Sequence, residues 1–433
     1  MFSSTHRTHR SSVNLHKQAS YFFFSLRMDY LKRVIGVGGA DETDSKSDTA
    51  ESKSEPDSTE DKSKPELKTG VITVEKVERP QVVRHDSKVL DLAFAMDCTG
   101  SMGSYIETAR QNIRTIVEEI VASEKSDIKL ALVEYRDHPP EDSSFVTRVH
   151  DFTPSPKTMK SWLDACSAEG GGDTAEAVAD ALHDLTKLSW RPEATKICVF
   201  ISDAPPHGLG CGSDGFPNGC PLGLDPLEIT RQLAVMGITI YLVGCEPDIT
   251  PFKEFFVAIA YITGGQYVPL RKANLLTQVI IGGAREEMSL EQWMAEVDEE
   301  VQQEVAAGRE IDEAEIHERV LSKLKSKGAK TNVLMRNSKD IESASDHAKK
   351  ISELSNMADV RKEFKPAAPM PALSFSVMER ASMAPSGRAS GGISEDDMAD
   401  ESYHCVESEV THHQAKRMVQ KSMMRNFAKK KAS

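Results

Sequence analysis

The chain has 433 residues, a formal net charge of -14, 28% charged residues and 6% aromatic residues. It is longer than one typical domain, so we expect one large or two small folded units together with tails. The negative charge argues against a general nucleic-acid binder, which needs a basic surface. No apolar run is long enough to predict a membrane-spanning helix.

The N-terminal part of the chain predicts no fold. Residues 1–27 carry Arg, His and Ser without an acid, as transit peptides do. We favour instead a disordered tail, or a gene model that should begin at Met28. Residues 40–68 contain almost no apolar side chains and cannot bury enough surface to offset their ordering entropy. We therefore predict that residues 1–87 form a disordered N-terminal region.

From residue 88, apolar runs of strand length alternate with segments of helical period. The predicted strands are 88–97, 128–137, 143–152, 195–203, 238–246 and 265–270, with 143–152 at an edge. The predicted helices are 104–121, 155–166, 174–188, 226–236, 251–262 and 274–281. Strands that alternate with helices build a mostly parallel sheet covered on both faces. We predict a doubly wound α/β domain over residues 88–285.

The C-terminal third has a different texture. Residues 286–327 predict acidic amphipathic helices interrupted near Gly308. Residues 328–411 lose this periodicity, so we predict that residues 328–433 are mostly disordered. The last segment, residues 412–433, is basic without an acid and has interleaved apolar residues. It predicts a basic amphipathic helix that could engage a calmodulin-like protein or an anionic membrane, with a solvated tail as the simpler alternative.

Seven cysteines are scattered along the chain. Cys211 and Cys220 share a loop and could pair or bind a metal, but their spacing fits no common zinc pattern, so we favour free loop thiols. Four others stand among apolar residues, as reduced core thiols do in intracellular proteins: Cys98, Cys166, Cys198 and Cys245. We expect a cytoplasmic protein.

Oxygen-bearing side chains follow two of the predicted buried strands. Asp97 ends the first, with Thr99 and Ser101 at alternate positions after it, and Asp203 ends another. Ligands of open parallel sheets bind beyond the carboxyl ends of the strands, so we expect these oxygens to converge. Such oxygens suit a hard cation such as Mg²⁺. Neutral hydroxyl ligands leave the ion under-neutralised, so an outside acidic group could complete its shell.

Between these two loops in the sequence lies another, "GGGD" followed by Thr174, which precedes a predicted helix on the same edge and is called the second loop below. Two roles remain open for Asp173, the last residue of this loop. It can cap the helix, in the pattern Asp173-x-x-Glu176, or it can contact the ion.

The stretches "DCTGSMG", "GGGDTAEAV" and "ISDAPPHG" resemble the von Willebrand factor A domain and its metal-ion-dependent adhesion site. The resemblance covers about residues 88–285. The family pattern D-x-S/T-x-S falls on Asp97, Thr99 and Ser101, and the family's later aspartate falls on Asp203. The resemblance implies Mg²⁺ or Mn²⁺ as the cofactor.

The family usually presents a threonine from the second loop, which would be Thr174, whereas here Asp173 stands directly before it. If Asp173 contacts the ion instead, the ion is better neutralised and binds outside acids more weakly. The candidate metal ligands are Asp97, Thr99, Ser101, Asp173, Thr174 and Asp203. The candidate partner contacts are Gly100, Met102, Gly171, Gly172 and His207.

The loop after Asp203 further resembles intracellular eukaryotic members of the family, including A domains attached to alpha-type protein kinases. Residues 286–433 show neither a kinase-like lobe nor a credible phosphate loop. We therefore predict a non-enzymatic binding module that captures an acidic group of a partner protein. The alternative is a regulatory part, or a relative, of an alpha-type kinase or an ATPase assembly. Extracellular adhesion is disfavoured, and a Cys211–Cys220 disulfide would favour it.

Overall fold

The computed structural model describes residues 86–124, 126–307, 312–367 and 401–432. Almost all of the expected disordered region 1–87, and residues 368–400 of the expected tail, lie outside the described residues. The question of a transit peptide in residues 1–27 lies outside them too.

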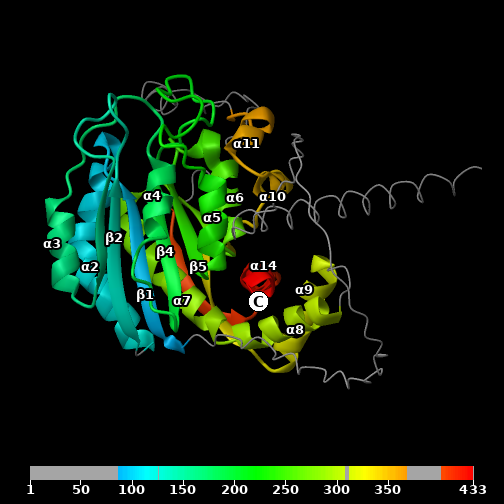
Figure 1. Ribbon diagram of the computed structural model, residues 1–433. Helices are drawn as coiled ribbons and strands as arrows, with labels where there is room; N and C mark the ends of the chain where they lie inside the picture. The colour runs from blue at the N-terminus through cyan, green and yellow to red at the C-terminus, as the bar shows by residue number, and fades with distance from the viewer. Residues whose placement is uncertain (1–85, 125, 308–311, 368–400, 433) are drawn as a thin grey trace, which may run out of the picture.

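A six-stranded sheet with the order β3-β2-β1-β4-β5-β6 forms the centre of the protein (Figure 1). Every neighbouring pair is parallel except β2 and β3, which are antiparallel, so β3 is the edge strand that the sequence predicts. The strands are β1 (Asp86–Asp97), β2 (Asp127–Tyr135), β3 (Thr147–Thr153), β4 (Ala194–Ser202), β5 (Ile238–Cys245) and β6 (Gln266–Leu270). The predicted doubly wound α/β fold is confirmed.

Alternate residues of β1 enter two separate cores, as the period of a strand requires. The helices that flank the sheet are α2 (Gly103–Glu124), α3 (Pro156–Ala165), α4 (Val178–Leu185), α5 (Pro226–Val235), α6 (Lys253–Ile262) and α7 (Leu276–Glu291). Leu92 and Phe94 join the core under α2, α3 and α7, whereas Ala93 and Ala95 join the core under α4, α5 and α6. Both faces of the sheet are therefore covered, and only its ends and edges remain for a site.

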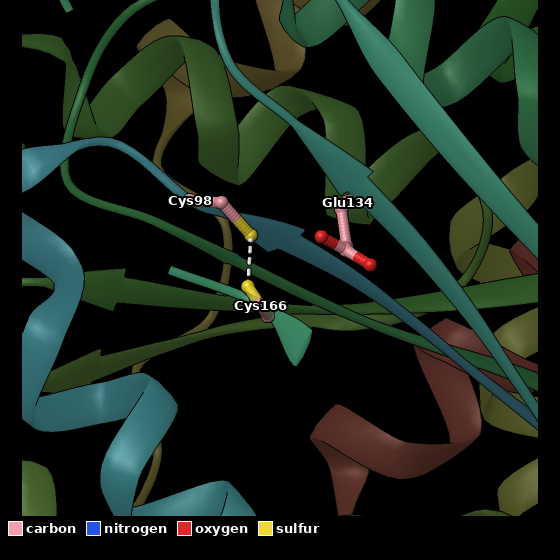
Figure 2. Close-up of side chains that lie close together, drawn as sticks. All are labelled: Cys98, Glu134 and Cys166. Carbon is pink, nitrogen blue, oxygen red and sulfur yellow. Dashed lines mark hydrogen bonds between the residues drawn. The ribbon is translucent and has the colours of Figure 1, made fainter. Parts of the chain in front are cut away.

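Four cysteines predicted to lie in the core are buried free thiols: Cys98, Cys166, Cys198 and Cys245. Cys98 directly follows the last residue of β1, and its Sγ lies 2.9 Å from Sγ of Cys166 (Figure 2). The contact with Cys166, together with burial, raises the pKa of the Cys98 thiol. This thiol pair packs the loop that follows α3 against the end of β1. Cys211 and Cys220 are free and half-buried.

Helix α7 continues to Glu291, past the predicted end at residue 281. It leads into α8 (Met294–Ala307) and α9 (Glu313–Ser326). The prediction that the chain is flexible after residue 328 is wrong for the described residues. A second sheet with the order β8-β7-β9 consists of β7 (Lys330–Arg336), β8 (Lys339–Asp340) and β9 (Tyr403–Glu409), and two short helices are α10 (Asp346–Glu353) and α11 (Met357–Glu363). These elements are short, and β7 pairs with a strand far along the chain, so local periodicity does not reveal them.

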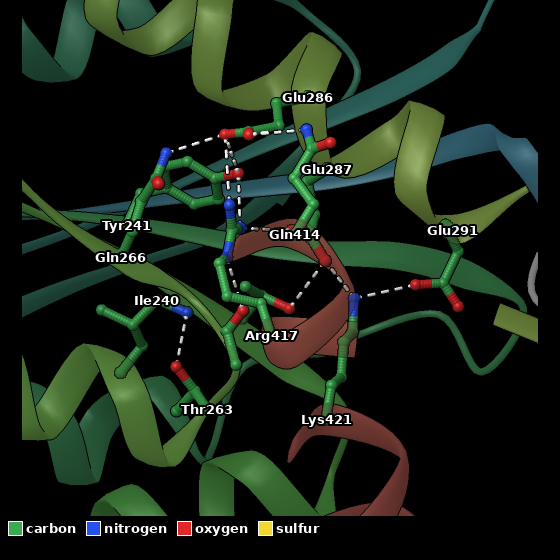
Figure 3. Close-up of polar contacts among 12 residues, drawn as sticks. Ile240, Tyr241, Thr263, Gln266, Glu286, Glu287, Glu291, Gln414, Arg417 and Lys421 are labelled. Atoms are coloured by element: carbon green, nitrogen blue, oxygen red, sulfur yellow. Dashed lines mark hydrogen bonds and ion pairs between the residues drawn. The ribbon is translucent and has the colours of Figure 1, made fainter. Parts of the chain in front are cut away.

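The basic C-terminal segment forms α14 (His412–Ala432), the helix that the sequence predicts. Its apolar residues Met418 and Val419 join the core shared by α8 and α9. Three of its cations are buried as well: Arg417, Lys421 and Arg425. Arg417 contacts Glu287 at 3.1 Å, and Lys421 contacts Glu291 at 2.8 Å (Figure 3). These three cations are therefore not available to a calmodulin-like protein or a membrane, because acidic residues of α7 neutralise them within the chain.

Candidate metal site at the carboxyl edge of the sheet

Strand register brings Asp97 and Asp203 to the same edge of the sheet. Met96 of β1 pairs with Ile201 of β4, and each strand ends within two residues of that pair. Asp97 ends β1, and Asp203 directly follows β4. Both carboxylates therefore lie at the carboxyl end of the sheet, as predicted.

Asp97 is fully buried. One of its oxygens, Oδ1, accepts hydrogen bonds from the Thr99 amide at 2.9 Å and from the Thr99 hydroxyl at 2.6 Å. The other, Oδ2, is buried and has no hydrogen-bond donor among the described residues. Burial, followed by the negative charge of Asp203, raises the pKa of Asp97 to about 7. A buried carboxylate oxygen without a partner costs free energy of folding unless a cation or a proton neutralises it.

Asp203 has a similar environment on the neighbouring strand. Ser101 is exposed, and its hydroxyl lies close enough to Asp203 to oppose the rise in the pKa of that carboxyl. The Oδ1 atom of Asp203 is buried, and no described residue donates a hydrogen bond to it. Burial raises the pKa of the Asp203 carboxyl. Thus the first and third loops bring Asp97, Thr99, Ser101 and Asp203 together.

The second loop presents different residues from those that the sequence indicates. Thr174 is exposed, and its hydroxyl contacts that of Ser213. Asp173 accepts hydrogen bonds from the amides of Ala175, at 2.8 Å, and Gly215, at 2.5 Å. Helix α4 begins only at Val178, so Asp173 does not cap it. Both predicted ligands therefore fasten the second loop to the long loop 204–225.

Glu176 is the acidic residue that the second loop contributes to the cluster. Its side chain is buried, and its Oε2 atom has no hydrogen-bond partner within the described chain. Burial and then the charge of Asp97 raise the pKa of Glu176 to about 10, with Asp203 among the further contributors. Its amide donates to the Pro205 carbonyl at 2.9 Å, so the third loop fixes its position. Sequence reasoning assigned Glu176 to a capping box, although an acid within the apolar run "AEAVADAL" is itself a signal.

Gly171 allows the second loop to approach the first. Its φ of +82° favours glycine, and a Cβ there would lie 3.0 Å from Oε1 of Glu176 and 3.4 Å from Cβ of Thr99. The neighbouring Gly170 carbonyl accepts a hydrogen bond from the Gly100 amide at 3.4 Å. Backbone contacts therefore hold Glu176 against the motif that begins at Asp97.

His207 and Met102, predicted to contact a partner, are buried in the structure, with exposed fractions of 3% and 0%. The two ring nitrogens of His207 contact Asp137 at 2.7 Å and Asp214 at 2.9 Å. Burial alone would lower the pKa of His207, but these two carboxylates raise it to about 9. His207 thus holds the loop 204–225 against the segment that follows β2. The prediction that His207 contacts a partner is wrong. Met102 fills the core instead. The predicted contacts that remain exposed are Gly100, Gly171 and Gly172.

Residues 91–209 match the family model of the von Willebrand factor A domain. The chain therefore contains an A domain of this family. It is 29% identical over 158 residues to alpha-protein kinase vwkA of Dictyostelium discoideum. The matched region covers 36% of this chain and 25% of that protein. It is 28% identical over 205 residues to a putative ariadne-like RING finger protein of Acanthamoeba polyphaga mimivirus, covering 45% of this chain and 20% of that protein. The chain spans about a quarter or less of the length of these relatives.

Similar solved structures include a von Willebrand factor type A protein from Catenulispora acidiphila, at 17% identity and a TM-score of 0.34. The aligned region covers 47% of this chain and 43% of that one. The pilus adhesin SpaC from Lactobacillus rhamnosus GG is another, at 11% identity and a TM-score of 0.36, covering 47% of this chain and 31% of that one. None of the described helices is long and apolar enough to cross a membrane.

Proposed function

We propose that the A domain binds Mg²⁺ or Mn²⁺ and uses the ion to capture an acidic side chain of a partner protein. A domains are in general protein-interaction modules, and the metal-dependent mode is the proposal. The candidate ligands are Asp97, Thr99, Ser101, Glu176 and Asp203, with Glu176 in place of the second-loop residues Asp173 and Thr174. We further propose that the A domain ends with α7 and that the segments after it extend the same folded body.

One observation carries this proposal: among the buried carboxyl groups with an oxygen that has no hydrogen-bond donor in the described structure, three come from the three predicted loops at this edge of the sheet. These groups are Asp97, Glu176 and Asp203. Their mutual repulsion and burial favour the protonated forms, whereas a divalent cation would let them ionise. Carboxylate and hydroxyl oxygens are also the donors that Mg²⁺ and Mn²⁺ prefer. The residues present therefore fit such an ion.

The rim of the site supports contact with another protein. Ser101, Gly100 and Gly171 are exposed beside the buried acids, so a partner side chain can approach the ion from this side. The number of ionised acids sets how strongly the ion attracts that side chain. Two carboxylates balance a divalent cation, and a third, Glu176, weakens the attraction for an outside carboxylate when it is ionised.

We propose a non-enzymatic role in the cytoplasm. The seven cysteines are all free thiols, which supports a reducing compartment. The second candidate function is a regulatory part of an alpha-type kinase or ATPase assembly, which the similarity to a Dictyostelium alpha-protein kinase favours. ATP-dependent phosphate transfer by the purified chain would support an enzymatic reading instead.

Affinity capture with the full chain tests the proposed function. We expect partner proteins retained in Mg²⁺ to be lost in EDTA and to be lost with Asp203→Asn. The control Thr174→Val alters a hydroxyl that contacts Ser213 and should retain the same partners. Capture that persists unchanged in EDTA and with Asp203→Asn would overturn the proposal.

A further inference from the structure

Three side chains from separate segments converge beside the loop 204–225: His138 after β2, Asp180 in the first turn of α4, and Cys220 in the loop itself. His138 Nε2 lies 2.9 Å from Asp180 Oδ2 and 3.7 Å from Cys220 Sγ, and Cys220 Sγ lies 3.3 Å from Asp180 Oδ2. His138 and Asp180 are buried, and Cys220 is half-buried. We propose that these three residues bind a transition-metal ion and that Zn²⁺ fits them best.

The spacing matches a shared ion. Zinc bonds are about 2.0–2.1 Å to imidazole nitrogen, 2.0–2.2 Å to carboxylate oxygen and 2.3 Å to thiolate, which places tetrahedral ligand atoms roughly 3.3–3.6 Å apart. The three observed distances need only small movements to reach this range. By contrast, the sulfurs of Cys98 and Cys166 are 2.9 Å apart, too close to share zinc, whose two thiolates lie roughly 3.7 Å from each other.

The same three residue types could form a nucleophile, a base and an orienting acid. That arrangement needs the thiol and the carboxylate on opposite ring nitrogens of the histidine. Here both contact Nε2 of His138. One nitrogen, one oxygen and one sulfur that face a common point are the arrangement of a metal site, and this mixed donor set suits zinc rather than magnesium.

The surroundings leave room for a fourth ligand. Asp180 and Cys220 line a pocket of about 150 Å³, which Glu176, Asn218 and Arg361 also border. A water molecule or a ligand atom from this pocket can complete a tetrahedral shell. The Leu222 amide lies 3.4 Å from the Cys220 sulfur and donates to it, which favours a thiolate.

A zinc ion here would hold the loop 204–225 against β2 and α4. The same loop carries His207, which contacts Asp137, and Pro205, whose carbonyl accepts a hydrogen bond from the Glu176 amide. Zinc would therefore order the loop that holds Glu176 in the candidate magnesium site. The two metal sites would share no ligand.

Cobalt substitution of the full chain tests this site, because Co²⁺ bound to a thiolate absorbs through a charge-transfer band. We expect metal-stripped protein to take up one Co²⁺ with this band, and Zn²⁺ to abolish the band in excess Mg²⁺. Cys220→Ser should remove the band. It should also weaken zinc binding at least about 10–100-fold, which is the effect of losing a residue that only supports a metal ligand. Asp180→Asn should weaken zinc binding similarly while the sulfur band persists at high Co²⁺.

Two controls separate this site from its neighbours. Cys211→Ser alters the other thiol of the loop, and Asp97→Ala alters the candidate magnesium site; both should keep the cobalt band. As a measurement that needs no variant, Zn²⁺ should protect Cys220 but not Cys211 from alkylation in the native protein. Absence of cobalt uptake, a band unchanged in Cys220→Ser, its loss in either control, or alkylation of Cys220 at the same rate with and without Zn²⁺ would overturn the proposal.

Discussion

Arg417 of α14 and Glu287 of α7 form an ion pair of 3.1 Å in the protein interior, with side-chain exposures of 3% and 1%. The pair joins α14 to α7, which packs on the central sheet (Figure 3). A second contact, 3.2 Å from Arg417 to Glu286, broadens the link. The C-terminal helix is therefore an integral part of the folded body.

Replacement of Arg417 should destabilise the protein strongly. Arg417→Met leaves Glu286 and Glu287 buried with less compensation, and breaking such a buried pair costs about 3–5 kcal/mol. The control Arg114→Ala breaks the exposed pair with Glu118, whose side chains are 80% and 61% exposed, and should change the stability little because water screens such a pair. Urea unfolding of both variants measures the difference. Equal losses would show that α14 contributes no more than a surface helix.

Glu176→Gln should make the protein less stable than the original chain only when metal is present. In EDTA the amide removes one of the mutually repelling acids, so the variant should unfold at the same temperature as the original chain or a higher one. In saturating Mg²⁺ the original chain should gain stability, by about 2.7 kcal/mol at a hundred times the dissociation constant. The variant should gain much less. Thermal unfolding of this variant beside Thr174→Val, which should behave as the original chain does, checks the assignment.

The metal-free protein should lose stability as the pH rises. The pKa of Asp97 rises from 3.8 to about 7, and that of Glu176 from 4.5 to about 10, because of burial and neighbouring negative charge. The folded state then binds more protons than the unfolded state, so the free energy of unfolding falls between about pH 4 and pH 10. The raised pKa of His207, about 9, acts in the same direction.

Urea unfolding across this pH range, in EDTA and in Mg²⁺, separates these contributions. In Mg²⁺ the free energy of unfolding should depend less on pH, because the bound ion keeps Asp97 and Glu176 ionised. The pH dependence that His207 contributes should remain. The same steep slope in Mg²⁺ as in EDTA would contradict a cation site among these carboxyl groups.

Gly171→Ala should weaken both the fold and the site. The added Cβ meets Glu176 and Thr99, and the positive φ of +82° adds backbone strain, which costs about 1–3 kcal/mol. The matched control is Gly212→Ala, where a Cβ meets no atom within 4 Å and φ is not positive; it should be neutral or slightly stabilising. Mg²⁺ titration by calorimetry and thermal unfolding report the two effects. Full cation binding by Gly171→Ala would mean that this close approach does not shape the site.

Much of the sheet and part of the site could be predicted from the sequence. The run that ends at Asp97 and the run that ends at Asp203 have strand length and apolar composition, and these are local properties. Because parallel strands share an edge, both carboxylates had to meet there. The choice between Thr174 and Glu176 is not local: it depends on Pro205 and Gly215, which hold the second loop from another part of the chain.

The amino-acid sequence by itself determined the alternation of strands and helices and the acids that end two strands, since periodicity and strand termini are properties of neighbouring residues. Only the tertiary structure decided which oxygens remain without donors, and that the acidic α7 neutralises the basic α14. Those outcomes depend on side chains that lie more than a hundred residues apart, such as Arg417 and Glu287, and no local pattern encodes which of them become buried together.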